Sequence, residues 1–169
     1  MRDWVEADFP AVGGWERPGA AVGAVVFAHD AGGRLLMQLR DDRPGLVHAG
    51  MWGPFGGGVE PGETLAQAAV REFAEETGLA LDTAALRPLA RVVSDSARRT
   101  RLIAFEAPMP APVEAVRLGE GAGFALLTTA QLERFPLTPP LRPVALALSR
   151  RLAGAAQQAA PYGQGAPAG

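Results

Sequence analysis

The sequence predicts an α/β protein, an α/β/α sandwich with a mixed β-sheet. Short apolar runs bounded by glycine, proline and aspartate are typical of strands, and they occur on both sides of a capped, amphipathic helix at residues 64–77. A second long helical pattern closes the domain at residues 138–152. Strands that precede and follow one central helix favour a single sheet covered by helices.

Length and composition fit one soluble domain. The 169 residues are 48% hydrophobic and 20% charged, and the net charge of −2 gives no electrostatic reason to expect nucleic acid or an anionic membrane as a partner. With no cysteine, the chain has no disulfide, no thiol nucleophile and no cysteine zinc site. The N-terminus is unlike a signal peptide, and no apolar run reaches membrane-spanning length. We therefore expect a cytoplasmic protein, and a homodimer is compatible with the sequence.

The chain divides into three parts. Residues 1–18 are an irregular lead-in, residues 19–152 form the domain, and residues 153–169 are a low-complexity tail that is expected to be disordered. In the lead-in, Trp4, Phe9 and Trp15 are apolar anchors that we expect to pack against the domain.

Five apolar runs are the predicted strands: residues 19–28, 34–40, 86–94, 100–107 and 124–127. The first two are expected to pair across the intervening HDAGG turn. Thr128 or Thr129 should cap a brief helix that runs through Arg134. Thr138 and Pro139 fit the N-cap and first position of the closing helix.

The central helix carries its own start and stop signals. Thr64 and Gln67 form a capping box, and Gly78 follows the last helical residue, Thr77, as a left-handed C-cap would. Its apolar face, which must be buried, consists of Ala66, Ala69, Val70 and Phe73.

The same helix carries an acidic face. Glu72, Glu75 and Glu76 stand at spacings that bring them together, and like charges one turn apart repel each other. Arg71 is expected to point toward Glu63 and the preceding loop rather than between these carboxylates. A lone ExxEE pattern is most often a solvated face, but an uncompensated cluster of oxygen ligands also suits Mg²⁺ or Mn²⁺.

The residues on either side of this pattern decide between the two interpretations. The stretch resembles the Nudix box, G-x5-E-x7-R-E-U-x-E-E-x-G-U, where U is a bulky apolar residue. Every fixed position is filled, by Gly57, Glu63, Arg71, Glu72, Phe73, Glu75, Glu76, Gly78 and Leu79. The order of the flanking elements extends the resemblance from about Gly19 to Leu152. It implies a Nudix fold, a divalent metal and hydrolysis of a nucleoside diphosphate linked to another moiety.

The resemblance also implies roles for individual residues. The candidate metal ligands that it implies are Glu72 and Glu76, together with Glu75 from the same cluster. The carbonyl of Gly57 or its neighbour and the carboxylate of Glu120 are further candidates. The candidate catalytic residues that the resemblance implies are Glu72, Glu75, Glu120, Arg71 and Glu63. Among these, the Glu63–Arg71 pair is expected to brace loop against helix. Family members often recruit one acid from outside the box; we favour Glu120, with Glu106 as the competitor, and the identity of the general base stays open.

The substrate is expected to be a small nucleotide-type molecule. Nucleoside triphosphates (oxidised ones included), nucleotide sugars and ADP-ribose all fit. Arg40 and Trp52 are candidate substrate-binding residues, whereas Phe55 is expected in the core. Other arginines that could bind phosphate are Arg91, Arg98, Arg99 and Arg101. His29 and His48 belong to no motif.

An alternative of a different class is a non-catalytic, nucleotide-binding regulatory module of the same fold. Such modules normally have an eroded box. The complete box here favours the enzyme.

Overall fold

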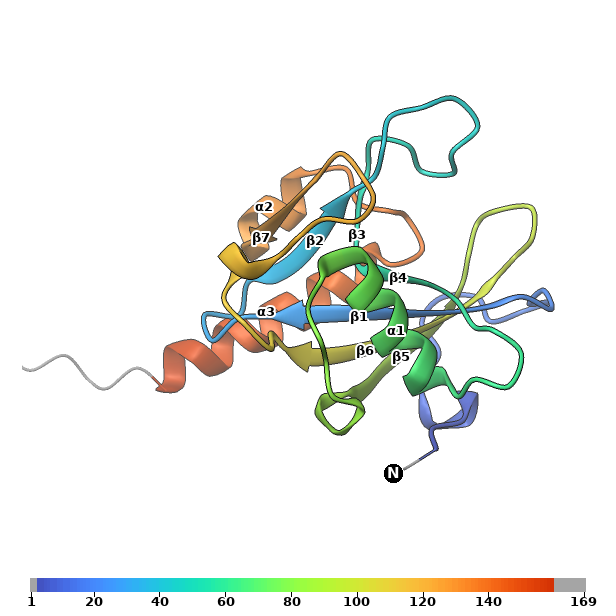
Figure 1. The fold of residues 1–169 in the computed structure, drawn as a ribbon, viewed down its shortest axis with the longest axis horizontal. Coiled ribbons are helices and arrows are strands. Elements are labelled where there is room, and N and C mark those ends of the chain that lie inside the picture. Colours follow the sequence, from blue (N-terminus) through green and yellow to red (C-terminus); the bar gives the residue numbers. More distant parts are fainter. Residues whose placement is uncertain (1–2, 160–169) are drawn as a thin grey trace, which may run out of the picture.

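The computed structural model of the chain describes residues 3–159. It contains seven strands: β1 (Val22–His29), β2 (Leu35–Leu39), β3 (Trp52–Gly53), β4 (Phe55–Gly58), β5 (Arg87–Val93), β6 (Arg101–Pro108) and β7 (Gly123–Leu127) (Figure 1). The α-helices are α1 (Leu65–Thr77), α2 (Thr129–Arg134) and α3 (Arg142–Ala159), and short 3₁₀ turns lie at Glu6–Asp8, Thr83–Ala85 and Val113–Ala115.

All seven strands belong to one sheet. Its main path is β3-β2-β1-β6-β5, with β4 paired to β1 and β7 paired to β2. The β1–β6 pair is parallel and the other pairs are antiparallel. The predicted mixed sheet is therefore confirmed, as is the pairing of the first two strands, which meet at His29 and Leu35.

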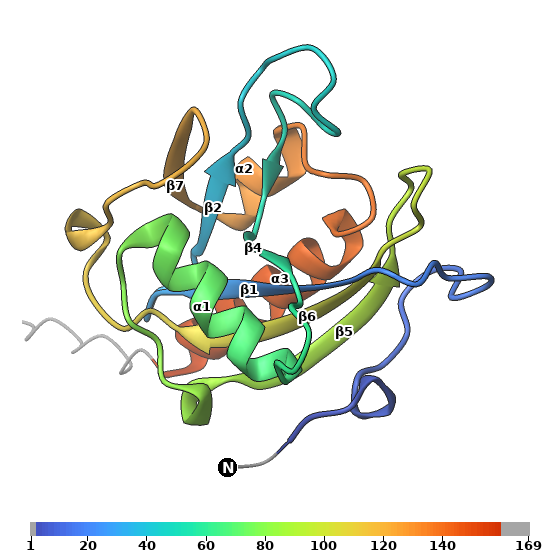
Figure 2. The same cartoon turned by 45° about the vertical axis from the view of Figure 1, so that its right-hand side comes forward.

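Helices cover both faces of this sheet (Figures 1 and 2). Strand β1 shows the division, because successive side chains of a strand point to opposite faces. Ala24 and Val26 belong to the apolar cluster that contains Phe73 of α1. Val25 belongs to the second cluster, together with Leu148 of α3. The predicted α/β/α sandwich follows directly from these two cores.

Helix α1 begins and ends as its sequence predicts. The Thr64 hydroxyl accepts a hydrogen bond from the Gln67 amide at 3.2 Å, and the Gln67 side chain accepts one from the Thr64 amide at 2.8 Å. At the other end Gly78 has φ 70°, and its amide donates to the Ala74 carbonyl. Of the predicted apolar face, Ala66, Ala69 and Phe73 are buried and Val70 is partly buried.

The closing helix differs from the prediction at both ends. It begins at Arg142, and the carbonyl of Thr138 accepts from the amides of Leu141 and Arg142 in the turn that precedes it. A proline disfavours the helical conformation in the residue before it, so Pro140 works against a helix that starts at Pro139. Helix α3 also continues past Leu152 to Ala159. The predicted tail thus starts inside a helix, and its residues 160–169 lie outside the described part of the chain.

The lead-in packs against the domain, as expected of its aromatic residues. Phe9 is 1% exposed, and its ring lies edge-on to Phe105 with 4.9 Å between centroids. The Arg91 guanidinium lies 4.8 Å from the ring of Trp15. Between residues 3 and 159, none of the helices has the length and apolarity needed to cross a membrane.

Candidate active site

Strand β4 places the glycine loop directly against α1. A Cβ added to Gly57 would lie 2.3 Å from Oε2 of Glu72, so that carboxylate is packed onto the bare Cα of the glycine. At Gly56, φ is 141° and a Cβ would lie 2.2 Å from the backbone carbonyl oxygen of Ala24. The first glycine of the pair is therefore needed by the sheet, whereas the second makes room for the carboxylate of Glu72.

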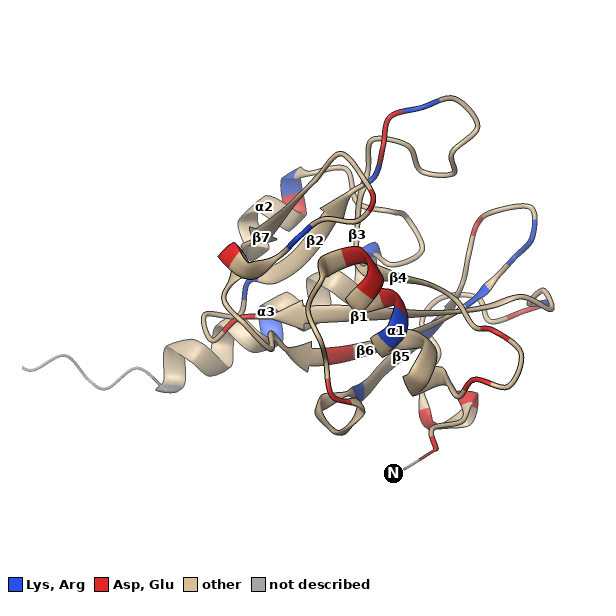
Figure 3. Cartoon of the chain, viewed as in Figure 1, with Lys and Arg blue, Asp and Glu red and all other residues tan. Residues whose placement is uncertain are grey.

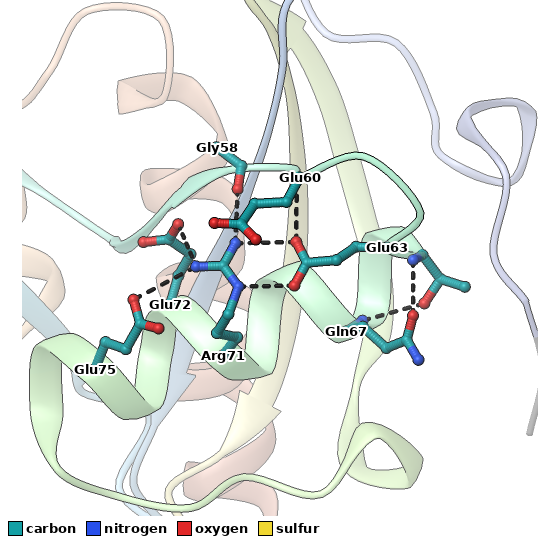
Figure 4. Close-up of polar contacts among 8 residues, drawn as sticks. Gly58, Glu60, Glu63, Gln67, Arg71, Glu72 and Glu75 are labelled. Atoms are coloured by element: carbon teal, nitrogen blue, oxygen red, sulfur yellow. Dashed lines mark hydrogen bonds and ion pairs between the residues drawn. The ribbon is translucent and has the colours of Figure 1, made fainter.

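Arg71 ties the loop to the helix (Figure 4). Its Nε donates to Glu63 Oε1 at 2.7 Å, and its Nη2 donates to Glu63 Oε2 at 3.0 Å and to the Gly58 carbonyl at 2.9 Å. The hydrogen bond from Arg71, followed by that from the Glu60 amide, lowers the pKa of Glu63 to about 2. The predicted Glu63–Arg71 contact is thus present, and Glu63 is ionised at neutral pH.

Arg71 also enters the acidic cluster, contrary to the expectation that it points away. Its Nη1 donates to Glu72 Oε1 at 2.8 Å and to Glu75 Oε2 at 3.4 Å. The guanidinium has five donors in a planar fork, so one side can serve Glu63 while the other serves the helix. The protein thus supplies its own counter-cation to two of the three helix carboxylates. The hydrogen bond to Glu63, followed by that to Glu72, raises the pKa of Arg71.

Glu75 and Glu76 do not share one solvent-directed face. The side chain of Glu75 is 60% exposed, whereas Glu76 turns toward β4 and accepts a hydrogen bond from the Gly56 amide at 2.7 Å. One residue step turns about 100° around a helix, so these two residues stand at opposite limits of the acidic face. Glu76 is the one beside buried Phe73.

This position changes the acidity of Glu76. Burial raises its pKa to about 7, against the opposing hydrogen bond from Gly56. The charges of Glu72 and Glu120 raise the pKa further, and the charge of Arg40 lowers it. Charges from α1 (Glu72), from the segment before β7 (Glu120) and from the end of β2 (Arg40) therefore all act on Glu76.

Glu120 is brought to the C-terminal end of α1 by backbone contacts. The amide of Gly119 donates to the Glu76 carbonyl at 2.8 Å, and the amide of Arg117 donates to the Thr77 carbonyl at 2.7 Å. The side chain of Gln38 donates to the carbonyl of Glu120 at 2.8 Å from the neighbouring strand β2. An exposed carboxylate is thus held beside the box carboxylates.

Glu106, the competitor, lies on the other side of the sheet. Its neighbours on β6, Ile103 and Phe105, belong to the α1 side and Ala104 to the α3 side. The Glu106 side chain lies on the same side of β6 as Ala104, and its carboxylate forms an ion pair with Arg151 of α3. The sheet separates it from the box.

The donor set suits a hard divalent cation. Every candidate side chain offers carboxylate oxygen, which Mg²⁺ and Mn²⁺ prefer, and acidic residues gather on α1 (Figure 3). The seat for Glu72 on Gly57 supports this fit. Within residues 3–159 no three such side chains converge closely enough to form a metal-binding group. The Glu72 and Glu75 carboxylates are turned to Arg71 and that of Glu76 to Gly56, so a cation would compete with these contacts.

A cavity of about 570 Å³ adjoins this site. Gly56 and Arg40 line it, which places both the glycine loop and the arginine that acts on Glu76 at its wall. Val25 and Leu102 contribute from β1 and β6. The volume is within the range of small-molecule sites.

The candidate arginines separate into two groups. Arg40 and Arg98 line the cavity. The guanidinium groups of Arg91, Arg99 and Arg101 donate to the N-terminal part of the chain, at Glu6, Glu16 and Arg17 of the lead-in and at Ala20 just after it.

The two aromatic residues beside the glycine loop pack away from the cavity. Trp52 stacks on Phe135 with 5.9 Å between centroids and is absent from the described cavity lining. Phe55 is fully buried and meets Phe73 edge-on, as predicted for a core residue.

Three contributing residues had no assigned role from the sequence. Gln38 is 5% exposed, and a polar residue inside the apolar run RLLMQLR is a signal that could have found it. Gly56 precedes the box and binds Glu76 through its amide. His48 lines the cavity, but nothing in its sequence surroundings indicates this.

Comparison with known proteins gives the family. A family model described as "NUDIX domain" matches residues 17–146. The chain belongs to the Nudix family. Two curated relatives match over shorter stretches. "Nucleoside triphosphatase NudI" of Enterobacter sp. (strain 638) is 44% identical over 59 residues, 35% of this chain and 40% of the relative. "Oxidized purine nucleoside triphosphate hydrolase" of Danio rerio is 49% identical over 51 residues, 30% of this chain and 31% of the relative. The chain thus matches less than half the length of either.

Solved structures show the same Nudix fold over most of the chain. The MutT protein from Methanosarcina mazei Go1 has a TM-score of 0.62 and 22% identity, covering 82% of this chain and 98% of that one. The MutT NUDIX hydrolase from Burkholderia pseudomallei has a TM-score of 0.60 and 27% identity, covering 79% and 98%.

Proposed function

We propose that this Nudix protein is a metal-dependent pyrophosphohydrolase. Its substrate is a nucleoside diphosphate linked to another moiety, of the nucleoside triphosphate, nucleotide sugar or ADP-ribose type, and water attacks one phosphorus. The observation that carries the proposal is the carboxylate cluster of α1, seated on Gly57 and held to the glycine loop by Arg71.

The charge of the cluster argues for a cation. Glu72 and Glu75 share one guanidinium, and the pKa of Glu76 is raised by burial and by the neighbouring charges of Glu72 and Glu120. A divalent ion would relieve this repulsion, with Glu72, Glu76, the backbone at Gly57 and either Glu75 or Glu120 as its ligands. When bound, Mg²⁺ or Mn²⁺ supplies neutralisation of the phosphate charge and a lower pKa for the attacking water.

The protein's own residues have distinct parts in this chemistry. Glu63 and Arg71 fix the loop relative to the helix, so that the ligands are positioned before substrate arrives. Glu120 approaches from outside the box and is the candidate to accept the proton of the water. Arg40 lines the cavity and its charge acts on Glu76, which supports a role for it in binding a phosphate of the substrate.

The names of the relatives support a nucleotide substrate. Both are described as triphosphate-cleaving enzymes, although each match covers only part of the relative. The alternative, a binding module without turnover, is disfavoured by a box in which Glu63, Arg71 and Glu72 are all present and in mutual contact.

A nucleotide panel tests the proposal. Nucleoside triphosphates, oxidised triphosphates, nucleotide sugars and ADP-ribose are incubated with Mg²⁺, with Mn²⁺ and with EDTA, and released phosphate, pyrophosphate and monophosphate are quantified. We expect turnover of at least one class with metal and none with EDTA. Tight binding of a nucleotide without turnover under any metal condition would contradict the proposal and favour the binding module.

A further inference from the structure

Two loops contribute lining residues to the cavity. The β2–β3 loop, residues 40–51, contributes Arg40, Val47 and His48. The β5–β6 loop, residues 94–100, contributes five lining residues: Ser94, Ser96, Ala97, Arg98 and Thr100. Both loops project from the same end of the molecule (Figures 1 and 2).

In the described part of the chain, one polar contact joins these two loops. His48 Nε2 lies 2.8 Å from Asp95 Oδ1. The His48 side chain is 18% exposed, whereas that of Asp95 is 50% exposed. The His48 imidazole is therefore largely buried, whereas the Asp95 carboxylate that it contacts is half exposed.

The backbone of His48 is in the left-handed region. Its φ is 57°, a value that histidine, asparagine and aspartate adopt more often than other residues with a side chain. The His48 carbonyl accepts from the Met51 amide at 3.2 Å, which closes the turn at the end of this loop.

The two loops are anchored differently. The β5–β6 loop is fixed to the chain around residues 16–19, because the amide of Gly19 donates to the Arg99 carbonyl at 2.8 Å and the Arg99 side chain donates to the carbonyls of Glu16 and Arg17. Among residues 3–159, the hydrogen bonds of the β2–β3 loop lie within the loop or at its own ends, such as Arg40 Nε to the Val47 carbonyl. The contact at His48 is thus what joins the β2–β3 loop to the fixed β5–β6 loop.

We propose that the His48–Asp95 pair is a clasp that closes this cavity around the nucleoside part of the substrate. The inference rests on the proposed function for the identity of the ligand. The cavity offers aliphatic walls at Val25, Leu102 and Leu141 for a base, and hydroxyl groups at Thr100 and Thr138 for a ribose. Its wall at Gly56 is shared with the carboxylate site, so a nucleoside here would leave its phosphates at α1. His48 and Asp95 are positioning residues, since they act through the placement of the loop.

The test measures binding without turnover. Affinities for AMP and GMP are measured by calorimetry in EDTA for the wild type, His48→Ala, His48→Asn, Asp95→Ala and the His48→Ala/Asp95→Ala double variant. The asparagine variant removes the imidazole and keeps a residue that, like histidine, tolerates positive φ. Arg43→Ala is the matched control: it removes a charge from the same loop at a side chain that is 71% exposed and outside the cavity lining.

We expect each single variant to weaken the tighter-binding monophosphate by about five- to tenfold. The double variant should be no weaker than either single one, because both remove the same contact. Arg43→Ala should bind as the wild type does. With a substrate and metal, KM should rise while kcat stays within about twofold, and melting temperatures should change little.

Unchanged affinities, or additive losses in the double variant, would overturn the clasp, as would a wild type that binds neither monophosphate. The proposed function fails separately. A wild type that binds AMP or GMP through the clasp but hydrolyses no member of the nucleotide panel would refute the enzyme and leave the clasp standing.

Discussion

At the residue scale, two adjacent glycines serve different needs. An added Cβ at Gly56 would meet backbone atoms of Ala24 and Val25, which cannot move without opening the sheet. The atoms nearest to an added Cβ at Gly57 would be those of the Glu72 carboxylate, the far end of a flexible side chain. The first glycine supports the fold and the second supports the site.

Alanine substitution should separate these two roles. We expect Gly57→Ala to keep its melting temperature within a few degrees and to lose at least about tenfold in kcat, because Glu72 is displaced. Gly56→Ala should be destabilised by about 3 kcal/mol, because of the clash and the positive φ at this position. Thermal melts and kinetics on both variants decide this. A fully active Gly57→Ala would show that the seat of Glu72 is irrelevant to turnover.

Glu76 is the residue whose ionisation the fold opposes. Its pKa in the folded protein is raised from 4.5 to about 7, mainly by burial. Between these two values the folded state binds one proton more than the unfolded state, so stability falls as pH rises. Glu63 has its pKa lowered to about 2, so it stays ionised in the folded state throughout this window. Its own contribution to the pH dependence is shared by a variant that keeps Glu63, and cancels in a comparison with that variant.

The free energy of unfolding of the metal-free wild type, taken relative to that of Glu76→Gln, should therefore be larger at pH 5 than at pH 8. The upper bound of the difference is about 3 kcal/mol, and solvent access to the carboxylate reduces it. Denaturant unfolding of both proteins in EDTA at several pH values measures this. Parallel stability profiles for wild type and variant would contradict a raised pKa at Glu76.

At the element scale, the site is a helix and a loop held in register by backbone contacts. The segment at residues 117–122 docks on the last turn of α1 through Arg117 and Gly119, and onto β2 through Gln38. A Cβ on Gly119 would lie 2.5 Å from the Glu75 carbonyl, so this approach needs glycine. The docking is what brings Glu120 to the cluster.

Two matched glutamates test this arrangement. Glu120→Gln should lower kcat by about 10²-fold with a modest change in KM, because the proposed proton acceptor is lost. Glu106→Gln should retain wild-type rates, since Glu106 contacts Arg151 on the opposite face of the sheet. Steady-state kinetics on both variants give the ranking, and the reverse ranking would move the role to Glu106.

Elements with local signals were predictable from the sequence, and those that depend on neighbours were less so. Helix α1 was predicted from its capping box, its apolar face and Gly78, all of which lie within one segment. Helix α3 has a weaker start, because Thr138 and Pro139 imitate a helix beginning while Pro140 delays it. Its continuation to Ala159 follows a low-complexity sequence that carries no strong apolar pattern.

The candidate site shows the same limit. The box gave the identities of Glu63, Arg71 and Glu72 and the contact between the first two. The orientation of Arg71 toward Glu75 depends on side-chain packing that periodicity does not determine. The inward turn of Glu76 depends on the Gly56 amide in β4, which the helix sequence alone does not show.

At the scale of the whole molecule, the sheet separates two tasks. Helix α1 carries the carboxylates on one face, while α3 and α2 complete the core on the other (Figure 2). The cavity and the carboxylate cluster meet where Gly56 lines one and hydrogen-bonds the other. A substrate that extends past Gly56 from one to the other would have its phosphates at α1 and its remaining moiety in the cavity.

The Mg²⁺ dependence of the initial rate, measured for wild type and Glu72→Gln on the best substrate of the panel, addresses the metal-dependent site directly. The wild-type rate should rise from zero and saturate with Mg²⁺. The variant should need more Mg²⁺ and reach a rate at least about 10²-fold lower, with an unchanged melting temperature confirming that it is folded. Full turnover by the wild type in metal-free buffer, or the same Mg²⁺ profile in both proteins, would contradict the assignment of the carboxylates on α1 as a metal-dependent hydrolytic site.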